Sequence, residues 1–170
     1  MPTKTKTKNL EQAHIGLSKE NRVKLIERLN KLLADEHLLY TKTRSYHWNV
    51  TGIHFVTLHE LFEEQYNEIK EMADEIAERN RMLGGMSIGT MAEFLEESRL
   101  SETPGTIPAA PDMIANLLDD HEHIISSLRD DIEACMEKFN DEGTADLLVG
   151  AMRSHEEMAW MLRSMANGKA

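Results

Sequence analysis

The chain has 170 residues and a mass of 19.4 kDa, which is enough for one domain of ordinary size. Hydrophobic residues make up 41% and charged residues 29%, a globular composition that excludes a wholly disordered or collagen-like chain. The formal net charge of -11 opposes a general affinity for nucleic acid, because phosphate binding depends mainly on cations.

No apolar run approaches the roughly 20 residues that a helix needs to cross a bilayer, and no apolar segment follows the N-terminal lysines. We therefore expect no membrane partner, no secretion signal and a cytoplasmic location. The single cysteine, Cys135, excludes an internal disulfide and a thiolate metal cluster, and it fits a reducing compartment. Any bound metal is then expected to be held by nitrogen and oxygen atoms.

Residues 1–17 are predicted to form a flexible basic N-terminal tail. Lys4, Lys6 and Lys8 precede the first acidic residue in a segment too polar to pack. Two interpretations stay open for these lysines: they keep the protein soluble, or they bind DNA, in which case the protein associates with the nucleoid.

The first half of the chain predicts two long helices joined by a short loop. Ser18 can cap a helix whose apolar residues recur mostly at intervals of three and four until about residue 48. A second helix is predicted over 56–83, and Gly84 and Gly85 follow it as a left-handed stop.

A long connection with a short helix of its own follows. Thr90 and Glu93 have the spacing of a capping box and predict an amphipathic helix over 91–100. After a proline-rich crossing, Pro111 opens a third long helix that is predicted to end around 139–143.

Thr144 is predicted to cap a fourth long helix that ends at Gly168. The order of elements is therefore two long helices, a crossover with a short helix, and two more long helices. This order predicts an all-α fold, a ferritin-like four-helix bundle over 18–168 whose long crossover joins helices two and three.

Four side chains on one side of the second helix form two pairs at the spacing i, i+4: His59 with Glu63, and Asp74 with Glu78. This spacing brings two side chains onto one metal ion. Eleven residues separate Glu63 from Asp74, about 16 Å at roughly 1.5 Å per residue, so one helix cannot close a single site. Solvated acids on a helix face are the alternative interpretation of each pair.

Two copies of this helix could close the site by meeting antiparallel about a two-fold axis near residue 68. The first pair of one chain would then face the second pair of the other, which gives two identical sites in a dimer. His47, at the end of the first helix, can add a third ligand beside His59. Such nitrogen and carboxylate ligands suit Fe(II) with open coordination positions.

These positions resemble the Dps family, the mini-ferritins named for DNA-binding protein from starved cells. Thr144-Ala145-Asp146 and Trp160 in the last predicted helix agree with the family. The main matching segments are Tyr46-His47-Trp48-Asn49-Val50, Gly52, Phe55, Leu58-His59-Glu60, Glu63, Asp74-Glu75-Ile76-Ala77-Glu78-Arg79 and Gly84-Gly85.

The resemblance implies a hollow dodecamer with intersubunit ferroxidase sites that oxidise Fe(II), preferably with hydrogen peroxide, and store ferric iron, which protects against oxidative damage. Trp48 resembles the aromatic residue next to the family's site, and simple packing is its alternative. Zinc is a candidate competitor for the iron. The implied iron ligands and catalytic residues are His47, His59, Glu63, Asp74 and Glu78; many members carry Asp at the position of Glu63.

Acidic residues near the start of the last helix line three-fold pores in the family, and Asp141, Glu142 and Asp146 occupy that region here. Ordinary capping acids are the alternative. DNA binding in the family usually depends on basic tails, which are the role implied for the three lysines.

Two other functions are possible for a chain of this kind. A DNA-coating shell with a vestigial iron site would not need the complete ligand set. A di-iron oxidase with its site inside one subunit needs a Glu-x-x-His pair on each of two core helices, and Glu11-x-x-His14 in the tail is the only such pattern. Five histidines stay unassigned: His37, His54, His121, His123 and His155.

Overall fold

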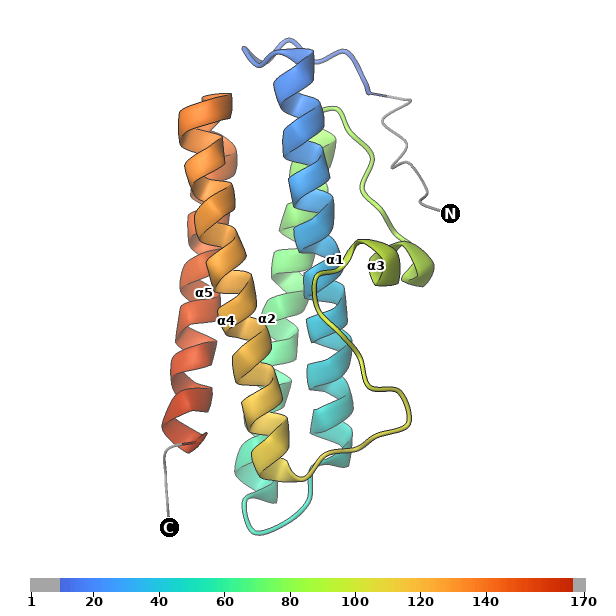
Figure 1. Cartoon of the computed structure of the whole chain (residues 1–170), viewed down its shortest axis with the longest axis vertical. Helices are drawn as coiled ribbons and strands as arrows, with labels where there is room; N and C mark the ends of the chain where they lie inside the picture. The colour runs from blue at the N-terminus through green and yellow to red at the C-terminus, as the bar shows by residue number, and fades with distance from the viewer. Residues whose placement is uncertain (1–9, 167–170) are drawn as a thin grey trace.

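The computed structural model describes residues 10–166 and contains no strand in that range, so the predicted all-α, ferritin-like fold is confirmed. Four long helices run side by side, and the short helix lies against the outside of the first one (Figure 1). A π-helical turn over Cys135–Phe139 follows the third long helix. The helices are α1 (Lys19–Asn49), α2 (Phe55–Met82), α3 (Met91–Glu97), α4 (Ala110–Ala134) and α5 (Glu142–Ala166).

The start of α1 and the end of α2 agree with the sequence prediction. The Ser18 hydroxyl accepts a hydrogen bond of 3.1 Å from the amide of Asn21 and caps α1. Gly84 has a φ of +83°, where a side chain would be strained, and a Cβ there would lie 2.8 Å from the guanidinium of Arg22. That guanidinium donates to the carbonyl of Leu83 at 2.8 Å, so it satisfies a backbone acceptor at the end of α2.

The chain is attached to the bundle before α1 begins. The amide of Glu11 donates to the carbonyl of Gly84 at 2.8 Å, and Leu10 and Leu17 pack against the core. Residues 10–17, expected to belong to the flexible tail, therefore contact the bundle. Lys4, Lys6 and Lys8 lie outside the described residues.

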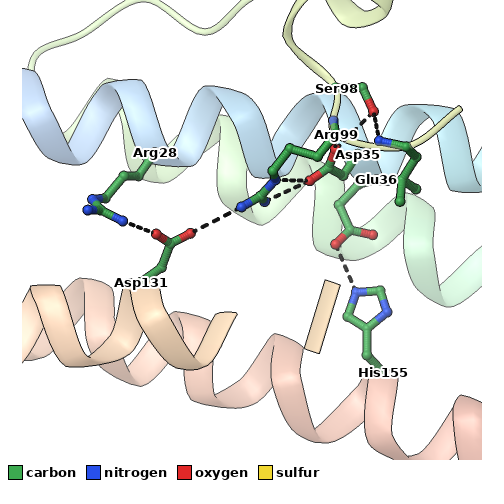
Figure 2. A network of polar contacts seen from close by, with 8 residues as sticks. Arg28, Asp35, Glu36, Ser98, Arg99, Asp131 and His155 are labelled. Carbon is green, nitrogen blue, oxygen red and sulfur yellow. Dashed lines mark hydrogen bonds and ion pairs between the residues drawn. The ribbon is translucent and has the colours of Figure 1, made fainter. Parts of the chain in front are cut away.

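The capping box of α3 is confirmed, since Thr90 accepts from the amide of Glu93 while Glu93 accepts from that of Thr90. The helix ends at Glu97, before the predicted residue 100. The reason is Asp35 of α1, a fully buried carboxylate that accepts from the Ser98 hydroxyl at 2.9 Å and from the Arg99 amide at 2.6 Å (Figure 2). These bonds hold the backbone in an extended turn instead of a further helical turn.

The predicted cap of the last long helix is wrong. α5 begins at Glu142, so Thr144 lies inside its first turn. Asp141 is the capping residue, because its carboxylate accepts from the Thr144 amide at 3.1 Å. Arg79 of α2 donates to both oxygens of Asp141, at 2.9 and 3.2 Å, which fixes the start of α5 against α2.

The core between the helices is built mainly of leucine, isoleucine, methionine and alanine, with Phe62 as its largest fully buried side chain. Among the described residues, no helix combines the length and the hydropathy of a membrane span. Buried polar residues interrupt the core near its middle, among them Glu36, His121 and His155.

Candidate metal centre

Two histidines form the base of the candidate centre, where α1 ends and α2 begins. The rings of His47 and His59 stack with centroids 3.8 Å apart and planes 17° from parallel. Each Nδ1 lies close to the other residue's backbone carbonyl, at 2.7 Å for His47 and 2.8 Å for His59. Because a carbonyl oxygen only accepts hydrogen bonds, each Nδ1 atom carries a proton and donates the hydrogen bond. In the neutral rings each Nε2 therefore carries a lone pair available to a metal ion.

Glu63 completes a three-residue group with these histidines. It lies one helical turn after His59, and the metal-binding atoms of the three residues all lie within 4.8 Å of one another. His47 is buried, His59 is half-buried and Glu63 is exposed, so the group is open on one side. Two imidazoles and one carboxylate are a ligand set that suits divalent iron or zinc and leaves coordination positions free.

Two aromatic residues support this group: Tyr66, which the sequence did not single out, and Phe55, which it gave no role at the site. The Tyr66 hydroxyl donates to Glu63 at 3.3 Å, and its ring meets that of His47 edge-on with centroids 5.3 Å apart. Desolvation and the Glu63 carboxylate raise the pKa of Tyr66 above its usual value, so the phenol stays a donor. Phe55 stacks on His59 at 5.1 Å. The position of Tyr66, three residues after Glu63, was the available signal.

The structure does not bring Asp74 and Glu78 to this group. Both are exposed on α2, and eleven residues of helix separate Asp74 from Glu63, about 16 Å. Each chain therefore carries a half-site of three candidate ligands and, further along the same helix, a separate pair of exposed carboxylates.

Trp48 follows His47 at the end of α1 and is 62% exposed. The Arg44 guanidinium lies 4.8 Å from the centroid of its ring, a cation–π contact. Trp48 is therefore a surface residue beside the half-site, not a core residue.

The acids near the start of α5 separate into two kinds. Glu142 and Asp146 are exposed, and the pore role stays a prediction for them. Asp141 is buried in its contacts with Arg79 and Thr144. Its carboxylate is occupied inside the subunit and is not presented to solvent.

Comparison with known proteins places this geometry in a family. Residues 26–168 match the ferritin-like domain family. A DNA protection during starvation protein of Bacillus anthracis is 41% identical over 143 residues, which are 84% of this chain and 97% of that protein. The chain belongs to the Dps family. A low temperature-induced protein of Nostoc, described as uncharacterized, is 48% identical over 160 residues, 94% of this chain and 89% of that protein.

Solved Dps structures share the whole fold. DpsC from Streptomyces coelicolor superposes with a TM-score of 0.92 at 30% identity, covering 99% of this chain and 98% of that one. The Dps protein of Vibrio cholerae, described as a member of the ferritin-like diiron-carboxylate superfamily, has a TM-score of 0.85 at 32% identity, with 91% and 96% covered.

Proposed function

We propose that this Dps protein oxidises Fe(II), preferably with hydrogen peroxide, at ferroxidase sites shared between subunits, and stores the ferric product inside a hollow dodecamer built from two-fold dimers. The activity would protect a cytoplasmic compartment from oxidative damage. The observation that carries the proposal is the half-site of His47, His59 and Glu63, whose two imidazole Nε2 atoms are free to bind a metal ion.

The second half of each site would come from a partner chain. Asp74 and Glu78 are exposed and lie too far along α2 to reach their own half-site. A two-fold axis near residue 68 would place these carboxylates on the partner's His59 and Glu63. Two further carboxylates would complete a nitrogen and oxygen ligand set for iron.

Exposed apolar residues lie close to the half-site histidines in the sequence, and one of them, Phe55, stacks on His59. Trp48 and Ile53 are 62% and 95% exposed, and Phe55 and Val56 next to them are exposed as well. Several large apolar side chains exposed in one short stretch of chain are typical of an interface, because a partner removes them from water. Their exposure supports an intersubunit position for the metal site.

Iron is the substrate of the proposed reaction. The neutral imidazoles and carboxylates would bind Fe(II) and favour its oxidised form, because anionic oxygen ligands stabilise the higher charge. Hydrogen peroxide accepts two electrons; two Fe(II) ions supply them, and two protons complete the formation of two water molecules. Reduction in this way avoids release of hydroxyl radical. Zinc, which binds the same ligand types, would compete for the site.

Glu142 and Asp146 are proposed to line the route by which iron enters the cage, since carboxylates repeated around a three-fold axis concentrate cations at an opening. Asp141, proposed from sequence for the same pore, would instead support it indirectly by holding the start of α5 to Arg79.

The choice of oxidant is tested by mixing the protein with Fe(II) without oxygen and then adding either hydrogen peroxide or air-saturated buffer. We expect peroxide to oxidise the iron faster, with two Fe(II) consumed for each peroxide and no hydroxyl radical trapped. Equal rates with the two oxidants would contradict the preference for peroxide. Radical yields equal to those of free Fe(II) would contradict the protective role.

DNA binding through Lys4, Lys6 and Lys8 is proposed as a second activity of the cage. If the iron site is vestigial, the alternative function is that of a DNA-coating shell. Many tails on one cage would act together, so retention of DNA should be strong at low salt and fall steeply as salt is added. Deleting residues 1–9 should abolish retention in a gel-shift assay. If DNA is still retained after the deletion, or if the full-length protein does not retain DNA at low salt, the tail is not a DNA-binding element.

A further inference from the structure

A pocket with mostly basic walls lies far from the half-site, in the first part of α1. It has a volume of about 330 Å³ and is lined by residues of α1, the crossover, the end of α4 and the π-helical turn. Arg28 in its wall and His47 are nineteen residues apart on α1, about 28 Å at roughly 1.5 Å per residue. Pockets that bind small molecules commonly have volumes of about 300–1,000 Å³, so this one is large enough for a ligand of its own.

The charge of the pocket is opposite in sign to that of the chain. Lys24, Arg28 and Lys31 follow one another on α1 at the spacing i, i+4, i+7 and therefore project from the same face of the helix. Arg99 adds a fourth cation from the crossover. Four basic and two acidic side chains line the pocket, an excess of two positive charges in a chain with a net charge of -11. Such a local reversal of sign attracts an anion.

Buried acids hold the two arginines in place from behind. Asp131 is 4% exposed and lies between them in Figure 2: one oxygen accepts from Arg28, and the other lies 3.9 Å from Arg99 Nη1. Asp35, fully buried, accepts from Arg99 Nε at 2.7 Å. The side chains of Arg28 and Arg99 are still 39% and 26% exposed. Because each guanidinium has five N–H donors, these contacts leave donors of both arginines for a ligand.

The two lysines of the pocket have no partner inside the subunit. Lys24 and Lys31 are exposed and form no ion pair or hydrogen bond with any residue between 10 and 166. Glu27, the second acid of the lining, pairs with neither of them. Lys42, further along α1, shows the contrast, since its ammonium contacts Asp120 at 2.5 Å. The ammonium groups of Lys24 and Lys31 are therefore available to an anion in the pocket.

We propose that this pocket binds a small molecule carrying a phosphate group, and that Arg28, Arg99, Lys24 and Lys31 hold the phosphate. The planar fork of a guanidinium matches two phosphate oxygens, and the flexible lysines add point charges around the others. Inorganic phosphate fills only part of the pocket, so there is also room for the rest of a phosphate monoester. A DNA duplex is too wide to enter a pocket of this volume, and the acidic chain around it repels a long polyanion.

The proposal is tested by isothermal titration calorimetry on iron-free, assembled full-length protein at low salt, with inorganic phosphate and with AMP as probes. We expect about one molecule bound per subunit, with a Kd of about 1 mM or tighter. Tighter binding of AMP would identify a phosphate monoester as the ligand, and equal binding would identify phosphate alone. Absence of binding by both probes would overturn the proposal. The measurement needs no iron, so its outcome is independent of the proposed function.

The double variant Lys24→Gln, Lys31→Gln tests the position of the site. Both lysines are exposed and unpaired, so the fold should not change, and their loss removes the excess positive charge of the pocket. Binding of either probe should weaken by about tenfold or more.

The matched control is the double variant Lys19→Gln, Lys70→Gln, which changes the net charge equally at exposed lysines outside the pocket. Its affinity for the probes should change by less than about twofold, because salt screens distant charges. An equal loss of affinity in the two double variants would show general attraction to the surface and refute the site. Wild-type affinity in the pocket variant would refute it as well.

Discussion

Replacing Asp74 by asparagine, or Glu63 by glutamine, is expected to slow the oxidation of Fe(II) by peroxide by about tenfold or more, because each change removes an anionic ligand. Both residues are exposed within the subunit, so the fold should not depend on their charges. Stopped-flow absorbance gives the oxidation rate, and light scattering shows whether the cage still assembles.

Neighbouring acids on the same helix provide the matched controls. Glu64→Gln and Glu75→Gln remove one charge next to Glu63 and Asp74, at positions that point about 100° away around the helix. Their oxidation rates should stay near that of the wild type. Wild-type rates in both ligand variants would remove Glu63 and Asp74 from the site.

The second large effect concerns stability. Asp35→Ala is expected to lower the free energy of unfolding by about 2–4 kcal/mol, since it leaves the Arg99 amide and guanidinium without their buried partner. Asp35 is fully buried, and Arg99 is about a quarter exposed, so part of the loss is recovered by water. The crossover after Ser98 should also become more sensitive to proteolysis.

Asp130→Ala is the control, because this acid is exposed on α4 next to the buried Asp131. It should change the free energy of unfolding by less than about 0.5 kcal/mol. Urea unfolding at one fixed protein concentration gives both values, because association contributes to the apparent stability. Equal stability of the two variants would show that Asp35 does not hold the crossover.

The sequence predicted the elements whose signals are local. Ser18 and the capping box of Thr90 mark helix starts through contacts within four residues, and Gly84 marks an end through its own φ. The start of α5 was placed wrongly because Asp141 competes with Thr144 as a cap. Arg79, more than sixty residues away, donates to both side chains and fixes them against α2, which the local sequence does not reveal.

The sequence predicted the spacing of the candidate ligands but not the protonation of the histidine rings. Spacing alone indicated His59 with Glu63 and the need for a second chain, because both follow from helix geometry. The protonation of the histidine rings did not follow from the sequence, since it depends on backbone carbonyls of the opposite helix. The contact between His121 and His155, 34 residues apart, likewise required the packing of α4 against α5.

The central claim, a site completed by two chains, is tested most directly by mixing chains that carry different defects. One variant lacks His47 and His59, the other lacks Asp74 and Glu78, and each alone should be inactive. In a two-fold dimer of unlike chains, one site collects both sets of changes and the other collects none.

Refolding the two variants together should therefore restore activity. With random pairing about half of the dimers are mixed and each regains one of two sites, so about a quarter of the wild-type ferroxidase activity should return. If all ligands came from a single chain, every site would stay defective. Activity no higher than that of the separate variants, in a sample shown by native mass spectrometry to contain mixed dimers, would contradict the intersubunit site.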